Sequence, residues 1–125
     1  MVTGQFSDSY PPIMDGVALT VASYVTELRR TLGPTYAVVP AAARSARGRP
    51  SEQGVRRYFS VPLAARAPYR IGLPQVDLPF QAAVHSLDFD LVHAHSPFSA
   101  GRLALRLARR RGIPIVATFH SKYRD

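Results

Sequence analysis

The feature that most constrains the fold is a strand–helix–strand pattern in the last third of the chain, at residues 90–119. Apolar runs predict strands at 90–95 and 115–119. Between them, positions 100, 103, 104, 107 and 108 are apolar and have helical spacing, which predicts a helix at 99–111. Ser99 is suited to cap that helix, and Gly112 is suited to end it. Strands joined through a helix run parallel, so the pattern predicts an α/β fold with a Rossmann-like, doubly wound parallel sheet.

The remainder of the chain is compatible with the same architecture. We expect a weak strand at 2–6, a helix from 17 that Gly33-Pro34 ends, a buried strand at 35–40, a second weak strand at 56–61 and a short helix at 78–87. Residues 41–53 are expected to form an exposed loop, and residues 62–79, with four prolines, an irregular connection. We expect a single domain over residues 1–125.

Composition narrows the class of protein. Hydrophobic residues make up 46% and charged residues 19%, which indicates a folded domain. Cysteine is absent, which excludes disulfides and thiolate metal sites. The net charge of +8, almost all of it from arginine, favours anionic partners such as phosphates or acidic lipids, although it is equally compatible with simple solvation of the surface. With neither a membrane-spanning run nor a signal-peptide pattern, we expect a soluble, cytoplasmic protein.

Three polar segments lie at the carboxyl ends of predicted strands, at 7–16, 93–99 and 118–125. In open parallel sheets ligands bind beyond the carboxyl ends of the strands, so these segments should line one site. Gly16, before a helix, would let the backbone approach an anion. His93 and His95 should share one strand face. We expect His93 to be a buried, hydrogen-bonded histidine and His95 to be functional; a metal site is not expected, because no third ligand is near in sequence.

Several function classes lose support because their motifs are absent. The chain has neither GxGxxG nor GxxxxGK[ST], which disfavours dinucleotide and P-loop binding. A GxSxG elbow is also missing, which disfavours a serine hydrolase. No nucleic-acid partner is expected, since the arginines accompany no recognisable nucleic-acid-binding motif.

The three polar segments resemble motifs of family 4 glycosyltransferases. Residues 4–12 with 15–18 resemble the pattern "FTDTY-P--NGVA", residues 90–98 resemble "D-VH-H-PF", and residues 114–125 resemble "P-V-T-HT-YED". The order and spacing of the three motifs make the resemblance specific, while the middle of the chain diverges.

The resemblance implies the N-terminal, acceptor-side domain of a two-domain GT-B enzyme, incomplete and without its C-terminal donor domain. Such an enzyme, a hexosyltransferase such as a mannosyl- or glucosyltransferase, moves a sugar from a nucleotide-sugar donor to a lipid or saccharide acceptor with retention of configuration. It needs no cofactor and no essential metal. The domain alone is not expected to catalyse transfer.

The resemblance also implies residue roles. The Gly16 backbone would approach the donor diphosphate, and His95 would be the catalytic residue that contacts the transferred sugar. The residues that line the acceptor side, or the cleft more generally, would be Asp15, His120, Tyr123 and Asp125. Asp15 stands where the family usually has asparagine, and Lys122 and Arg124 also depart from the pattern, which puts the acceptor contacts in question.

Two expectations concern partners and the class of function. A basic domain would be drawn to an anionic membrane surface, so we expect peripheral binding at the inner face of the membrane. The alternative function is a non-catalytic α/β binding module, or an inactive fragment, whose basic surface binds anionic membranes or phosphorylated ligands.

Overall fold

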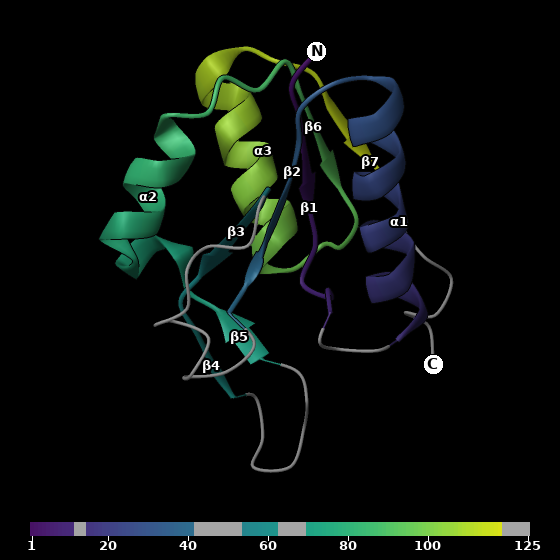
Figure 1. Cartoon of the computed structure of the whole chain (residues 1–125). Helices are drawn as coiled ribbons and strands as arrows, with labels where there is room; N and C mark the ends of the chain where they lie inside the picture. Colours follow the sequence, from purple (N-terminus) through teal and green to yellow (C-terminus); the bar gives the residue numbers. More distant parts are fainter. Residues whose placement is uncertain (12–14, 42–53, 63–69, 119–125) are drawn as a thin grey trace.

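Five parallel strands form the central sheet of the computed structural model, which describes residues 1–11, 15–41, 54–62 and 70–118 (Figure 1). The strand order is β3-β2-β1-β6-β7. The strands are β1 (Thr3–Phe6), β2 (Thr35–Pro40), β3 (Val55–Tyr58), β6 (Leu91–Ala94) and β7 (Ile115–Ala117). Each neighbouring pair is parallel. This order, with the first strand in the middle, confirms the Rossmann-like doubly wound sheet that the sequence predicts.

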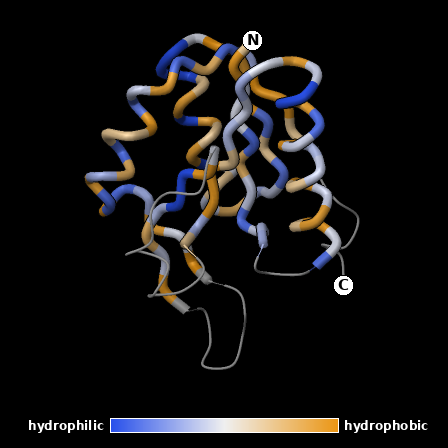
Figure 2. The backbone as a smooth tube through the Cα atoms, viewed as in Figure 1, coloured by the Kyte–Doolittle hydropathy of each residue, from blue (hydrophilic) through white to orange (hydrophobic). Residues whose placement is uncertain are grey.

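Helices cover both faces of the sheet. Helix α1 (Gly16–Thr31) lies on one face, and α2 (Leu78–His85) and α3 (Ser99–Arg111) lie on the other (Figure 1). Alternate residues of β2 show the two layers: Ala37 and Val39 pack with Val25 of α1, whereas Val38 joins the core beneath α2 and α3. Figure 2 shows hydrophobic and hydrophilic residues alternating along the helices, as expected for helices that bury one face.

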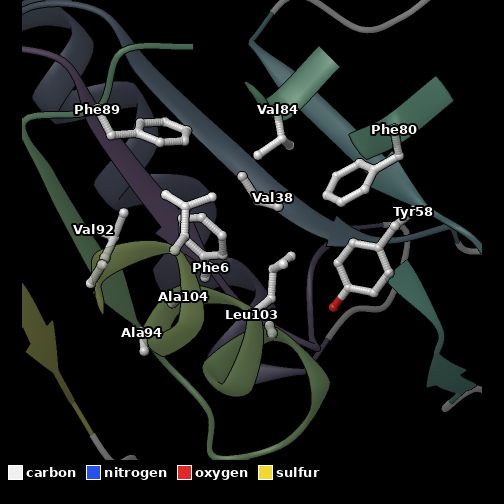
Figure 3. Close-up of a cluster of buried hydrophobic side chains, with 13 residues drawn as sticks. Phe6, Val38, Tyr58, Phe80, Val84, Phe89, Val92, Ala94, Leu103 and Ala104 are labelled. Atoms are coloured by element: carbon white, nitrogen blue, oxygen red, sulfur yellow. The ribbon is translucent and has the colours of Figure 1, made fainter. Parts of the chain in front are cut away.

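The larger core lies between the sheet and helices α2 and α3 (Figure 3). Phe6, Val38 and Val92, from three adjacent strands, are fully buried in it. Gly4 is needed on the same face, since a Cβ atom there would lie 2.7 Å from the Phe6 ring and 2.9 Å from the Phe89 ring. The short strand β1 thus lies at the centre of the sheet and is closely packed on this face.

The middle of the chain corrects two sequence predictions. The expected strand at 56–61 divides into β3 and β4 (Ser60–Pro62), because the Phe59 amide donates to Asp77 instead of to the main sheet. The expected irregular connection at 62–79 contains β5 (Arg70–Gly72), which pairs antiparallel with β4, and a short 3₁₀ helix, η2 (Pro74–Val76). Of the expected loop at 41–53, residues 42–53 lie outside the described residues, and Ala41 is buried.

Helix ends also differ in part from the prediction. Helix α1 begins at Gly16, with Asp15 as its N-cap. The predicted N-cap role of Ser99 is wrong, because Ser99 is already the first residue of α3 and its hydroxyl donates to Asp8. Gly112 ends α3 in the left-handed conformation, with φ of 63°, as predicted. None of the helices in the described ranges has both the length and the apolar character needed to cross a membrane.

Candidate functional site

The candidate site lies where the strand order reverses, between β1 and β6. The chain leaves β1 for α1 on one face and leaves β6 for α3 on the other face (Figure 1). Ligands of open α/β sheets bind at the carboxyl ends of such strands, and we call this region the candidate crevice. The loops after β1 and β6 contact each other here. The Asp8 amide donates to Ser96 Oγ at 3.1 Å, and the His95 amide donates to the Phe6 carbonyl at 2.8 Å. The first two polar segments of the sequence thus lie together, as predicted.

The N-terminus of α1 forms one wall of this crevice. Asp15 accepts hydrogen bonds from the Ala18 amide at 2.7 Å and from Ser9 Oγ at 3.2 Å. Gly16, the first residue of the helix, is exposed. A helix N-terminus carries partial positive charge, and the Asp15 carboxylate opposes that charge. The approach to Gly16 therefore combines accessible backbone with a fixed negative group.

A cluster of Gln5, Tyr24, His93, His95 and Thr118 lies between the sheet and α1. The rings of His93 and His95 are 3.9 Å apart between centroids, which confirms that they share one face. His95 Nε2 is 2.6 Å from Gln5 Oε1 and His93 Nε2 is 2.8 Å from Thr118 Oγ1. Because an amide oxygen only accepts, Nε2 of His95 is the donor.

The cluster explains the burial of both imidazoles. The Tyr24 ring lies 5.5 Å from that of His93 and 5.3 Å from that of His95. His93 is 8% exposed and hydrogen-bonded, as we expect for a structural histidine, and His95 is 0% exposed. His95 directly follows β6, at the carboxyl end of that strand, yet its side chain is more deeply buried than that of His93.

A second cluster surrounds Asp8. Its carboxylate accepts from Ser96 Oγ and Ser99 Oγ, each at 2.5 Å, and from the Ala100 amide at 3.3 Å. Tyr58 Oη lies 2.9 Å from Ser99 Oγ. Sequence reasoning missed this cluster, because 91 positions separate Asp8 from Ser99 and no local spacing connects them. The one signal in the sequence is that Asp8 and Ser96 both lie within segments that resemble family motifs, at residues 4–12 and 90–98.

The direction of the Tyr58 hydrogen bond follows from its neighbours. A serine hydroxyl has one hydrogen, and that of Ser99 points to Asp8, so Tyr58 donates to Ser99. Burial raises the pKa of Tyr58 well above its ordinary value, the Asp8 charge raises it further, and the hydrogen bond with Ser99 opposes both. Tyr58 is therefore a neutral donor at physiological pH.

The third polar segment is described only to its first residue. Thr118 contacts His93, and its amide donates to the Ala94 carbonyl at 2.9 Å, so the start of this segment lies beside the crevice. His120, Tyr123 and Asp125, which the sequence predicts on the acceptor side, lie outside the described residues. Within the ranges given above, no group of three His, Cys, Asp or Glu side chains is placed to hold a metal ion.

Arginines lie both beside the loop after β1 and on the exposed face of α3. Arg57, at the end of β3, donates to the Pro11 carbonyl at 2.8 Å and lies over the Tyr10 ring at 5.7 Å, which fixes the loop after β1. On α3, four arginines are exposed on the side away from the sheet: Arg102, Arg106, Arg109 and Arg110.

Comparison with known proteins gives a consistent result. The sequence model of glycosyltransferase family 4 matches residues 14–125. The chain is 28% identical over 135 residues to an alpha-monoglucosyldiacylglycerol synthase of Acholeplasma laidlawii, covering 100% of this chain and 31% of that protein. It is also 28% identical over 125 residues to a protein of the same name from Streptococcus pneumoniae (strain ATCC BAA-255 / R6), covering 100% of this chain and 28% of that protein. No solved structure matches it significantly. The chain spans under a third of the length of these relatives.

Proposed function

Because the chain belongs to glycosyltransferase family 4, we propose that it forms the acceptor-side wall of a sugar-transfer site in a two-domain GT-B enzyme. The enzyme transfers a hexose from a nucleotide sugar to a lipid or saccharide acceptor with retention of configuration. The observation that carries this proposal is the meeting of the loops after β1 and β6 at the reversal of strand order. Ligands of open α/β sheets bind at such crevices.

We assign the donor diphosphate to the backbone of Gly16. Its exposure at the first position of α1 supports this assignment, since backbone N–H groups at a helix N-terminus attract phosphate oxygens. The reaction places negative charge on the departing diphosphate, which preorganised N–H donors stabilise. Asp15 lies beside the same position and makes it less attractive to anions than an amide side chain would.

We assign the contact with the transferred sugar to His95. Its place directly after β6 supports the assignment, and its Nε2 is already a hydrogen-bond donor. Tyr24 and the neighbouring side chains cover the ring, so donor binding must uncover it. His120, Tyr123 and Asp125 remain proposed acceptor-side residues on the basis of the motif resemblance.

We further propose a lipid acceptor and peripheral binding at the cytoplasmic, inner face of an anionic membrane. The names of the two relatives support a glycerolipid acceptor. The exposed arginines of α3 support attraction to anionic headgroups. The reaction we propose uses no cofactor and no essential metal. No specific observation favours the alternative of a non-catalytic binding module.

The proposal is tested by measuring transfer from a panel of nucleotide sugars to diacylglycerol with the intact protein that carries these residues. We expect turnover with at least one donor, and we expect His95→Ala to lower kcat at least ~100-fold, as does removal of one group that stabilises transition-state charge.

His93→Ala is the matched control, because it removes a neighbouring stacked imidazole that bonds Thr118. We expect it to lower kcat less than about tenfold, since its role is structural. Absence of transfer with every donor would overturn the proposed function. Unchanged transfer by His95→Ala would overturn only the role of that residue.

A further inference from the structure

We propose that Asp8 is a positioning residue that couples the N-termini of α1 and α3 across the candidate crevice. Asp8 lies in the loop after β1, and it bonds the first turn of α3 directly. Through the next residue, Ser9, the same loop bonds the N-cap of α1. The consequence for catalysis rests on the proposed function, whereas the coupling itself does not.

On the α3 side, Asp8 supplies the cap that the helix lacks locally. Phe98, at the N-cap position, makes no side-chain cap bond. The carboxylate of Asp8 accepts from the Ala100 amide and from the hydroxyls of Ser96 and Ser99. An anion at this place is stabilised by the helix dipole and by charge-assisted hydrogen bonds.

On the α1 side, the connection runs through a second carboxylate. Ser9 Oγ donates to Asp15 Oδ2 at 3.2 Å, and Asp15 Oδ1 accepts from the Ala18 amide in the first turn of α1. Ser9 is itself held by Ser7, whose Oγ accepts from the Ser9 amide at 3.1 Å and donates to the Ser9 carbonyl at 2.8 Å. The connection therefore runs from α3 to Asp8 by hydrogen bonds, from Asp8 to Ser9 by a peptide bond, and from Ser9 through Asp15 to α1 by hydrogen bonds.

The surroundings leave the α3 end of this chain of bonds little freedom. A Cβ atom at Gly101 would lie 2.1 Å from the Ser96 carbonyl oxygen, and one at Gly72 would lie 2.5 Å from Ser99 Oγ. Tyr58 Oη holds Ser99 from the third side. Close packing of this kind transmits a displacement instead of absorbing it.

The charge of Asp8 is required, and not only its shape. Both serine hydroxyls and an amide point their hydrogens at the carboxylate. Asparagine has the same shape, but its NH₂ group donates and would face one of these donors. Because its oxygens are already occupied by three donors, Asp8 is a positioning residue and not a nucleophile.

The functional consequence follows from the neighbours in sequence. Asp15 precedes Gly16, the proposed diphosphate contact, and Ser96 follows His95, the proposed sugar contact. The Asp8 connection therefore sets the distance between the two contacts with the donor. Misplacement of such groups reduces turnover strongly.

The coupling is tested by amide hydrogen exchange on the intact protein and on Asp8→Asn. We expect exchange to accelerate about tenfold or more at Ala100, where a direct charge-assisted bond is weakened, and also at Ala18 and Leu19, which Asp8 does not contact. The matched control is Asp90→Asn, which alters a carboxylate that accepts from the Val2 amide at the opposite edge of the sheet. We expect it to leave all three amides unchanged.

A second variant, Ser9→Ala, removes only the link to Asp15. It should accelerate exchange at Ala18 and leave Ala100 unchanged, and it gives the answer even if Asp8→Asn does not fold. The coupling is overturned if Asp8→Asn affects α3 alone, or if Ser9→Ala leaves Ala18 at the exchange rate of the unmodified protein.

The catalytic consequence is tested with the same variants in the transfer assay, at a temperature at which each remains folded. We expect Asp8→Asn to lower kcat/KM about tenfold and to raise KM for the donor, and Asp8→Glu to recover part of the loss. Asp90→Asn should retain kcat/KM within about twofold.

The outcomes separate the two proposals. Absence of transfer by the unmodified protein contradicts the proposed function and leaves the exchange result to decide the coupling. Normal kcat/KM in Asp8→Asn, with an active unmodified protein, contradicts the positioning role.

Discussion

Tyr58 is a fully buried phenol whose hydroxyl has a partner on another element. Its hydroxyl donates to Ser99, and Ser99 in turn donates to Asp8. Burial and the nearby carboxylate both raise the pKa of Tyr58, because each disfavours the phenolate. The folded state therefore favours the protonated form of this residue.

Alkaline pH should therefore weaken the fold through Tyr58. In the unfolded chain a tyrosine ionises near pH 10, whereas the folded protein keeps this proton because its pKa is raised. The stabilising effect is fully present below about pH 10 and is lost as the pH rises further, with a slope of about one proton.

Tyr58→Phe tests this expectation by urea unfolding between about pH 8 and pH 11. At pH 8 the free energy of unfolding of the variant should be about 1 kcal/mol lower, because phenylalanine cannot make the hydrogen bond to Ser99. Above about pH 10 it should fall less steeply than that of the unmodified protein. Parallel pH curves for the two proteins would contradict the assignment of this proton to Tyr58.

At the scale of elements, α1 and α3 begin with carboxylates of different origin. The N-cap of α1 is the local residue Asp15, whereas the carboxylate at α3 comes from Asp8, far away in sequence. Both carboxylates stabilise their helices through the dipole. Only Asp15 lies beside the position proposed for the donor diphosphate.

Asp15→Asn should therefore tighten donor binding without weakening the helix. Asparagine and aspartate are equally good N-caps, so we expect the free energy of unfolding to change by less than about 0.5 kcal/mol. Removal of the negative charge beside Gly16 should lower KM for the nucleotide sugar several-fold at low ionic strength.

The measurement is donor KM at low and high salt for both proteins. The difference should shrink as salt rises, because added ions screen the repulsion. An equal or higher KM in Asp15→Asn would show that the diphosphate binds away from Asp15. Asp15→Ala is the control for capping, and it should lose about 1 kcal/mol of stability.

At the scale of the whole molecule, the two long helices among the described residues differ in how their basic charge is balanced. Helix α3 turns four arginines to solvent on the face opposite the sheet, whereas the exposed Arg30 of α1 is paired with Glu27. The four exposed arginines of α3 thus contribute to the net charge of +8 from a single helix face. A surface of this kind is attracted to anionic lipid.

Arg106→Gln should weaken binding to vesicles that contain phosphatidylglycerol about fivefold, since one basic residue near such a surface contributes ~1 kcal/mol. Arg30→Gln is the matched control and should change binding less than about twofold, because its charge is already balanced by Glu27. Sedimentation with vesicles measures both. Equal losses for the two variants would indicate that net charge, and not the α3 face, governs binding.

Much of this fold could be predicted because its elements have strong local patterns. The helix period of α3 and the left-handed stop at Gly112 are properties of neighbouring residues. The central place of β1 could not be predicted from its four residues, because it follows from pairing with β2 and β6. Ser99 was predicted as a cap from its type, but Asp8 competes successfully for its hydroxyl.

The candidate site was predictable in outline for a similar reason. Polar residues after parallel strands must gather at one edge, so the meeting of the loops that carry Asp8 and Ser96 follows from topology. The burial of His95 depends on Tyr24, which belongs to a different element, and no sequence pattern predicts that contact. The long-range hydrogen bonds and the burial of the site residues therefore could not be predicted from the sequence.

The central position of β1 has a consequence for synthesis on the ribosome. Thr3–Phe6 is made before both of its partners. It soon meets Thr35–Val38, but its other partner, Leu91–Ala94, is made much later. Until then one edge of the nascent sheet is open, and unpaired edges invite association with other chains. The order of translation thus leaves β1 paired on one side only until Leu91–Ala94 has been made.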